Sequence, residues 1–415
     1  MRSSHERYLA PGRLLAALLV ALLAGGAASA QETIKVGFIL PLTGAAAAEG
    51  LAVQEGAELA ARLINEAGGV QVGGTSYTFE LLFEDDQCNP QAATEASTRL
   101  IAEEVDFVGG SFCSSAALAA QPLFAAFDIP QFVYAYADDL TGASRVDSGA
   151  DMSVRLGPKA FIEMAPLAKY AVVENGHTSF FAMAQNTDFG RSMVQEFQRV
   201  AESLGASFVA EPEYFQFGAT DFRTLLTRAR DSGADAILAI GLAAEMIGIT
   251  LQYDELGLDM PLYGSDLLNT EAYQEAVGDL DDGFYSPWFY DDGQTQRAFE
   301  GELDEPMAVE LDSAFRENVG RPAEMNNAWG WGTIHLIRQG VERAASVDAA
   351  EVMAAILSGE EFDMPFGRYG FEQCGQANMR AGVAVYSAED GKVLVAGRDY
   401  VELDPVVLTR EDLCG

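Results

Sequence analysis

Short apolar runs alternate with helix-like stretches along most of the chain, and this alternation restricts the fold more than any other feature. Apolar strands separated by helices of crossover length pair in parallel. Their near-continuous apolar character indicates a sheet that helices cover on both faces. In the first part of the chain, strands are predicted at 34–40, 77–86, 105–112 and 129–137, and helices at 52–69, 90–104 and 114–128.

The same alternation restarts after about residue 156, which predicts a second unit of the same kind and an α/β fold of two doubly wound parallel-sheet lobes. Strands are predicted at 179–185, 207–215, 234–242 and 261–266, and helices at 189–205, 221–233 and 243–257. Residues 278–306 mix acids, glycine and aromatics and are predicted to form a loop that crosses between the lobes. A hairpin is predicted over 379–403, turning at Asp390-Gly391.

The first thirty residues have the pattern of a secretory signal peptide. Arginines at 2, 7 and 13 precede an apolar stretch at 14–24, which is too short to span a membrane. Small residues at Ala28 to Ala30 fit the cleavage rule, so we expect cleavage near Ala30 and export of the mature chain.

Composition argues against several classes of function. A net charge of −38 repels nucleic acid and anionic lipid, so neither is expected as a partner. Of only three histidines, His177 and His335 stand far apart, which argues against a zinc site and a histidine-based triad. No P-loop or dinucleotide motif is present, and no cofactor, metal or catalytic residue is expected. Asp85-Asp86 fits a cation site or, as we favour, a solvated turn.

Four cysteines in an exported chain suggest two disulfides. The pairing of Cys88 with Cys113 and of Cys374 with Cys414 is the most economical of the three possible. Cys113 stands in "GGSFCSSAAL", where it is open to three interpretations: a disulfide partner, a buried thiol or a nucleophile on a tight turn. The disulfide is favoured, because no histidine partner is evident and Cys88 follows a neighbouring predicted strand.

Ser114 begins the predicted helix 114–128, and its position has two explanations. A serine at a helix start caps a backbone N–H group. The same helix end carries unpaired N–H groups and the positive end of the dipole, which together form a site for a carboxylate. The residues alone leave both roles open.

Motifs along residues 34 to about 400 resemble the substrate-binding proteins of ABC importers for leucine, isoleucine and valine. They include "IKVGFILPLTG", "FEDDQCNP", "GGSFCSSAAL", "DFRTLLTRARDSGADAI" and "AAEMIGITLQ". The resemblance implies a type I periplasmic binding protein, a monomer without enzymatic activity, whose lobes are joined by a three-strand hinge. It also implies a membrane permease as partner. We expect a signal peptide at 1–30, lobe 1 at 31–155 plus 287–362, and lobe 2 at 156–286 plus 363–415.

The resemblance also implies which residues hold the ligand. Ser114 would bind a ligand carboxylate and Glu245 an ammonium group. Ala137 stands where relatives carry Ser or Thr, while the carbonyl of Ala135 can still accept from an ammonium. Glu49 and Phe189 replace expected tyrosines. The expected ligand is an aliphatic amino acid; the alternatives are an aromatic carboxylate or a small amide, and a secreted cysteine hydrolase or a sensor is less favoured. The candidate ligand-binding residues are Phe112, Ser114, Ser115, Ala135, Tyr136, Ala137, Phe189 and Glu245.

Overall fold

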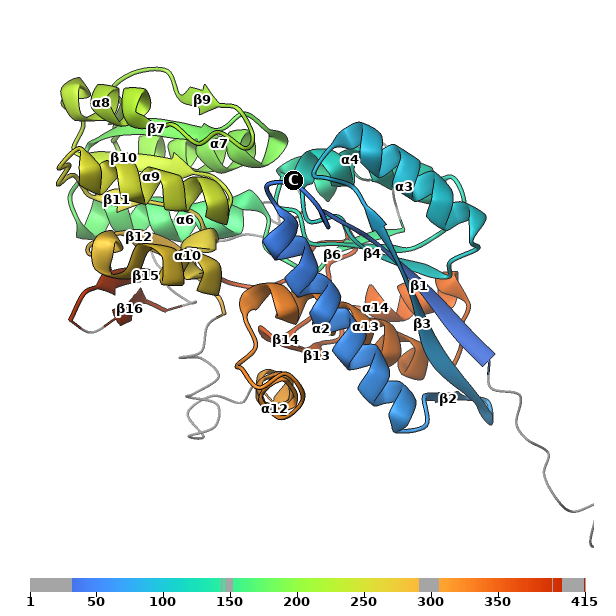
Figure 1. Ribbon diagram of the computed structural model, residues 1–415. Coiled ribbons are helices and arrows are strands. Elements are labelled where there is room, and N and C mark those ends of the chain that lie inside the picture. Colours follow the sequence, from blue (N-terminus) through green and yellow to red (C-terminus); the bar gives the residue numbers. More distant parts are fainter. Residues whose placement is uncertain are drawn as a thin grey trace, which may run out of the picture.

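The computed structural model describes residues 32–142, 145, 152–290, 306–389, 391–397 and 414. The predicted signal peptide therefore lies outside the described residues. Within them, two helix-covered sheets lie side by side (Figure 1). No helix in this part of the chain has the length and apolar character needed to cross a membrane.

The first sheet has six strands in the order β2-β3-β1-β4-β5-β6, and all neighbours except β2 and β3 run parallel. Side chains of β1 alternate between its two faces: Val36 and Phe38 join the larger core and Ile39 the smaller. The strands are β1 (Glu32–Leu40), β2 (Val70–Val72), β3 (Thr75–Asp85), β4 (Phe107–Gly110), β5 (Gln131–Val133) and β6 (Ser153–Arg155).

Helices cover both faces of this sheet. On one face, α2 (Ala47–Glu66) packs against α13 (Met325–Ala344). On the other, α3 (Pro90–Ala102) packs against α4 (Ser114–Ala125). The helices α12 (Pro306–Asn318) and α14 (Ala349–Ile356) and the hairpin of β13 (Phe362–Met364) and β14 (Gly367–Tyr369) complete this half.

The second sheet has eight strands in the order β16-β15-β12-β11-β10-β7-β8, with β9 also pairing with β7. Its parallel part ends at β12, against which β15 pairs antiparallel. The strands are β7 (Ser179–Gln185), β8 (Ser207–Phe208), β9 (Glu213–Phe215), β10 (Ala236–Ile240), β11 (Leu262–Tyr263), β12 (Tyr285–Trp288), β15 (Gly382–Ser387) and β16 (Gly391–Ala396).

Two groups of helices flank the second sheet (Figure 1). On one face, α6 (Ala160–Lys169) packs against α7 (Asp188–Ser203); the other face carries α8 (Arg223–Ser232), α9 (Ala243–Glu255) and α10 (Glu271–Val277). The chain passes between the two halves three times: from β6 to α6, from β12 to α12 and from β14 to β15.

The doubly wound α/β architecture and the hairpin of β15 and β16 confirm the sequence predictions. The single strand predicted at 207–215 is wrong: β8 and β9 are separate, with Pro212, which lacks an N–H donor, between them. The segment 278–306 is more than a loop, because it contains β12. The expected lobe limits at 286/287 and 362/363 fall within β12 and β13, and the two-lobe division remains a proposal.

Both predicted disulfides are present. The Cα atoms of Cys88 and Cys113 lie 5.3 Å apart, and those of Cys374 and Cys414 lie 5.6 Å apart. The expectation of a solvated turn at Asp85-Asp86 is wrong for Asp86, which is fully buried and accepts a 2.8 Å hydrogen bond from the Cys88 N–H. Burial raises the pKa of Asp86 to about 6. This carboxylate therefore orders the turn that carries Cys88.

Candidate functional site

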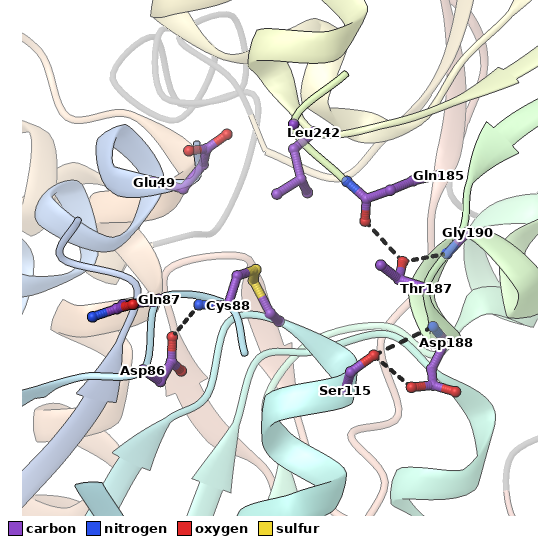
Figure 2. The surroundings of a disulfide bond; sticks show 12 residues. Glu49, Asp86, Gln87, Cys88, Ser115, Gln185, Thr187, Asp188, Gly190 and Leu242 are labelled. Atoms are coloured by element: carbon purple, nitrogen blue, oxygen red, sulfur yellow. Dashed lines mark hydrogen bonds between the residues drawn. A yellow bond between two sulfur atoms is a disulfide. The ribbon is translucent and has the colours of Figure 1, made fainter. Parts of the chain in front are cut away.

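A cavity lies between the two sheets, where strands β4, β7 and β10 end. Ligands of open α/β sheets bind at this edge, beyond the carboxyl ends of the strands. The disulfide between Cys88 and Cys113 forms part of its wall (Figure 2). The lining residues are Cys88, Phe112, Cys113, Ser114, Ser115, Tyr134, Tyr136, Gln185, Thr187, Phe189, Phe217, Leu242 and Leu267.

The N-terminus of α4 faces this cavity without a side-chain cap. Cys113, not Ser114, is the N-cap residue, and no side chain caps the helix there. Among the described residues, the N–H groups of Ser114, Ser115 and Ala116 have no hydrogen-bond acceptor. The hydroxyl of Ser114 instead accepts a 3.1 Å hydrogen bond from the N–H of Ala137. Of the two explanations left open by the sequence, the simple cap is therefore wrong.

Aromatic side chains from both halves surround the cavity. Phe112, Tyr136 and Phe189 were predicted at the site and line it, and the rings of Tyr136 and Phe189 lie 6.2 Å apart. Phe217, from the loop after β9, was not predicted, because nothing in its local sequence distinguishes it from a core residue. Leu242 and Leu267 were missed for the same reason.

Glu245 lies behind the cavity wall and not in it. Its carboxylate accepts hydrogen bonds from the side-chain amide of Gln185 at 2.8 and 3.0 Å, and from the N–H groups of Gly218 and Leu242, each at 2.8 Å. The bond to Leu242 satisfies the N-terminus of α9. Burial raises the pKa of Glu245, and its hydrogen bonds oppose that shift.

The alanines predicted at the site are close to it but do not line it. Ala135 and Ala137 are buried in a small apolar cluster with Val133 and Leu140. The carbonyl of Ala137 accepts a 2.5 Å hydrogen bond from the buried guanidinium of Arg155. Hydrogen bonds to Arg155 and to Ser114 therefore hold the loop that carries both alanines.

Hydrogen bonds between three pairs of residues join the two halves around the cavity. The hydroxyl of Ser115 donates to Asp188 at 2.5 Å, as Figure 2 shows. The hydroxyl of Tyr136 donates to Asp266 at 2.9 Å.

In the third pair, a hydrogen bond runs from the N–H of Ala243, at the start of α9, to Glu49 in the first turn of α2, at 3.3 Å. Glu49 is therefore buried between the halves and does not lie in a solvated loop. Together these bonds hold the two sheets close around the cavity.

Two polar residues of the cavity, Gln185 and Thr187, were not predicted from the sequence. The Thr187 hydroxyl donates to the side-chain oxygen of Gln185 at 2.8 Å, and the same threonine caps α7 (Figure 2). Both stand at the carboxyl end of the predicted strand 179–185. The edge rule that selected Ser114 would have selected them as well.

Comparison with known proteins gives the same architecture. The family model described as "Periplasmic binding protein" matches residues 33–392. The leucine-, isoleucine-, valine-, threonine- and alanine-binding protein of Pseudomonas aeruginosa is 26% identical over 88% of this chain and 92% of its own length.

Solved structures match as well. The leucine-binding protein LivK of Thermotoga maritima has a TM-score of 0.76 and 22% identity over 88% of this chain and 98% of its own. An ABC transporter solute-binding protein of R. palustris in complex with benzoate has a TM-score of 0.75 and 23% identity, over 88% and 96% of the two chains. This chain therefore belongs to the periplasmic binding protein family, the solute-binding proteins of the ABC transporter type.

Proposed function

We propose that this protein captures a small solute with one carboxylate and an aromatic or otherwise apolar body, and delivers it to the membrane permease of an ABC importer. The observation that carries this proposal is the uncapped start of α4, which opens into a cavity lined mainly by aromatic and apolar side chains. Within the described part of the chain, no lysine, arginine, aspartate or glutamate lines that cavity.

The carboxylate would bind at the start of α4. Three N–H groups there lack acceptors among the described residues, and the helix dipole adds positive potential. The Ser114 hydroxyl accepts from Ala137, so its own hydrogen is available to donate to the carboxylate. Phe112, Tyr136 and Phe189 would then enclose the body of the ligand.

The hydrogen bonds of Glu245 favour a ligand that has a carboxylate but no ammonium group. The carboxylate that the family resemblance assigns to an ammonium is already bonded to Gln185, Gly218 and Leu242. An aromatic carboxylate needs no such partner. The R. palustris neighbour, in complex with benzoate, is an instance of this fold with such a solute.

A branched-chain amino acid is the second candidate. The P. aeruginosa relative is named for leucine, isoleucine, valine, threonine and alanine, and Glu245 stands just behind the cavity wall. The cysteine hydrolase considered from the sequence loses its support, because Cys113 is joined to Cys88.

Binding measurements on the full mature protein test the proposal. After copurified ligand has been removed by unfolding and refolding, melting temperature and calorimetric affinity are measured with benzoate, 4-hydroxybenzoate, leucine, isoleucine and valine. We expect the aromatic acids to raise the melting temperature most. Stabilisation by the amino acids alone would establish the second candidate instead.

Substitution of Ser114 tests the site. Ser114→Ala removes the hydroxyl donor and should weaken carboxylate binding at least tenfold, about 1.4 kcal/mol. Ser97→Ala is the matched control, because Ser97 is also buried but donates only to Ala93 within α3. Equal losses in the two variants would contradict a carboxylate site at Ser114.

A further inference from the structure

We propose that Gln185 determines specificity: its side-chain amide occupies the carboxylate of Glu245 and so excludes solutes that carry an ammonium group next to the carboxylate. This inference rests on the proposed function and deepens it by naming the excluded class. It is carried by the position of Gln185, which lines the cavity and donates to Glu245, while Glu245 itself does not line the cavity.

The carboxylate of Glu245 is already hydrogen-bonded by Gln185, Gly218 and Leu242. A carboxylate offers about four lone-pair positions. One oxygen accepts from the N–H of Gly218 and from Gln185, and the other accepts from the N–H of Leu242 and from Gln185. The amide nitrogen of Gln185 lies 3.0 and 2.8 Å from the two oxygens, so an N–H group of this cavity-lining side chain is shared between them.

The orientation of the Gln185 amide is fixed from both ends. Its nitrogen donates to Glu245, and its oxygen accepts a 2.8 Å hydrogen bond from the hydroxyl of Thr187. A flipped amide would place its oxygen against a carboxylate and its nitrogen against a hydroxyl that caps α7. Both Gln185 and Glu245 are at least 97% buried, so water cannot readily replace either partner.

This arrangement changes what a ligand meets at this wall. An ammonium entering the cavity meets a neutral amide and must displace it to reach a negative charge. If it cannot, it is buried without a counter-charge, which strongly disfavours binding. A solute with a plain carbon in place of the ammonium carries no such cost. Gln185 therefore selects by charge without contacting the ligand carboxylate.

Removal of the amide should expose Glu245 without displacing it. In Gln185→Ala, the N–H groups of Gly218 and Leu242 still hold one position on each carboxylate oxygen. The place that the Gln185 amide holds becomes open to the cavity that this side chain lines. The variant should therefore acquire a buried negative group of the kind that an amino-acid ammonium needs.

Matched ligand pairs that differ only in the ammonium group provide the test. The pairs are L-leucine with 4-methylpentanoate and L-phenylalanine with 3-phenylpropanoate, measured calorimetrically on the full mature protein. Wild type should prefer the acid without the ammonium in each pair. Gln185→Ala should shift the ratio of dissociation constants at least tenfold toward the amino acid.

Two further variants show whether Glu245 causes the change in the ratio of dissociation constants. In Gln185→Ala/Glu245→Gln the gain should disappear, because the exposed carboxylate is gone. Gln252→Ala removes a buried glutamine amide that bonds Thr220 and Phe222 and does not line the cavity, and should leave the ratio within about twofold of wild type. Gln185→Ser replaces the alanine variant if the latter fails to fold, as judged by circular dichroism.

The results of these binding measurements distinguish failure of this inference from failure of the proposed function. Wild type that binds leucine more tightly than 4-methylpentanoate overturns the inference, as does an unchanged ratio in Gln185→Ala. A gain that persists in the double variant overturns it too. If wild type binds none of the aromatic acids but Gln185→Ala gains leucine binding through Glu245, the inference stands and the proposed ligand class fails.

Discussion

The hydroxyl of Tyr136 donates a 2.9 Å hydrogen bond to Asp266, and this bond links the cavity wall of one sheet to the buried interior of the other. Tyr136 follows β5 of the six-stranded sheet, and Asp266 follows β11 of the eight-stranded sheet. The buried carboxyl group of Asp266 also interacts electrostatically with that of Glu163 on α6. A ligand that contacts the Tyr136 ring therefore acts on a bond that holds the two halves together.

Loss of the Tyr136 hydroxyl should weaken ligand binding. Tyr136→Phe keeps the ring against Phe189 and removes only the bond to Asp266, which should cost about 1 kcal/mol, or roughly fivefold in affinity. Calorimetry with the tightest-binding carboxylate measures the change. Tyr134→Phe, whose hydroxyl bonds Thr333 away from Asp266, is the control. Equal effects in the two variants would argue against a special role for the Asp266 bond.

Asp266 and Glu163 should make folding stability depend on pH. Burial raises the pKa of Asp266 to about 7 and holds that of Glu163 well above its ordinary value. A carboxyl group whose pKa is raised in the folded protein stabilises the fold most when protonated. Stability from this pair should therefore fall as pH rises from about 4 through about 7. We expect a loss on the order of 2 kcal/mol, measured by urea unfolding.

The variant Glu163→Gln isolates this effect. The glutamine amide donates to Asp266 as a protonated glutamate would, but it cannot lose a proton. Tyr136 is an ionisable group that interacts with both carboxyl groups, and it remains in the variant. The fall in stability with pH should be smaller in Glu163→Gln than in wild type. Identical pH profiles would show that the pair does not titrate in this range.

Structural features that depend on residues close together in the sequence could be predicted from the sequence. Pro90 at the first turn and Gly257 after α9 predict helix ends by local geometry, and the structure has helix ends beside both. The spacing of Cys88 and Cys113 at adjacent strand ends likewise predicted their disulfide.

The environment of Glu245 could not be predicted in this way. Its partners Gln185 and Gly218 lie 60 and 27 residues away and meet it only when β7, β9 and α9 pack. The same holds for Asp86, whose burial depends on strands that the local pattern cannot position.

The disulfide between Cys88 and Cys113 should stabilise both the fold and the site. It closes a loop with a sequence separation of 25, and loops of this length contribute roughly 3 kcal/mol. The double variant Cys88→Ser/Cys113→Ser should lose about that much stability in urea unfolding, and ligand affinity should fall because Cys113 is the N-cap residue of α4. Thiol titration of unreduced wild type should find no reactive thiol at either position. A free thiol there would contradict the disulfide.

Glu49 occupies a different contact between the halves. One carboxylate oxygen accepts from the N–H of Ala243, and the other has no hydrogen-bond partner among the described residues. Its pKa is raised to about 7, mainly by burial and to a smaller extent by the nearby carboxylates of Glu324 and Glu245. Separation of the halves would return Glu49 to water and lower its pKa, so closure around a ligand should take up a proton.

Ligand affinity should therefore fall as pH rises, and Glu49 should be responsible for part of that fall. A carboxyl group whose pKa is higher in the closed form favours closure below that pKa, and the benefit is lost as pH rises through about 7. Between about pH 5.5 and 7.5, wild type should lose at least fivefold more affinity than Glu49→Gln, which keeps an acceptor for Ala243 but carries no charge. Calorimetry with a carboxylate that is fully ionised across this range measures the difference. Parallel pH profiles in the two proteins would show that Glu49 stays in one protonation state during closure.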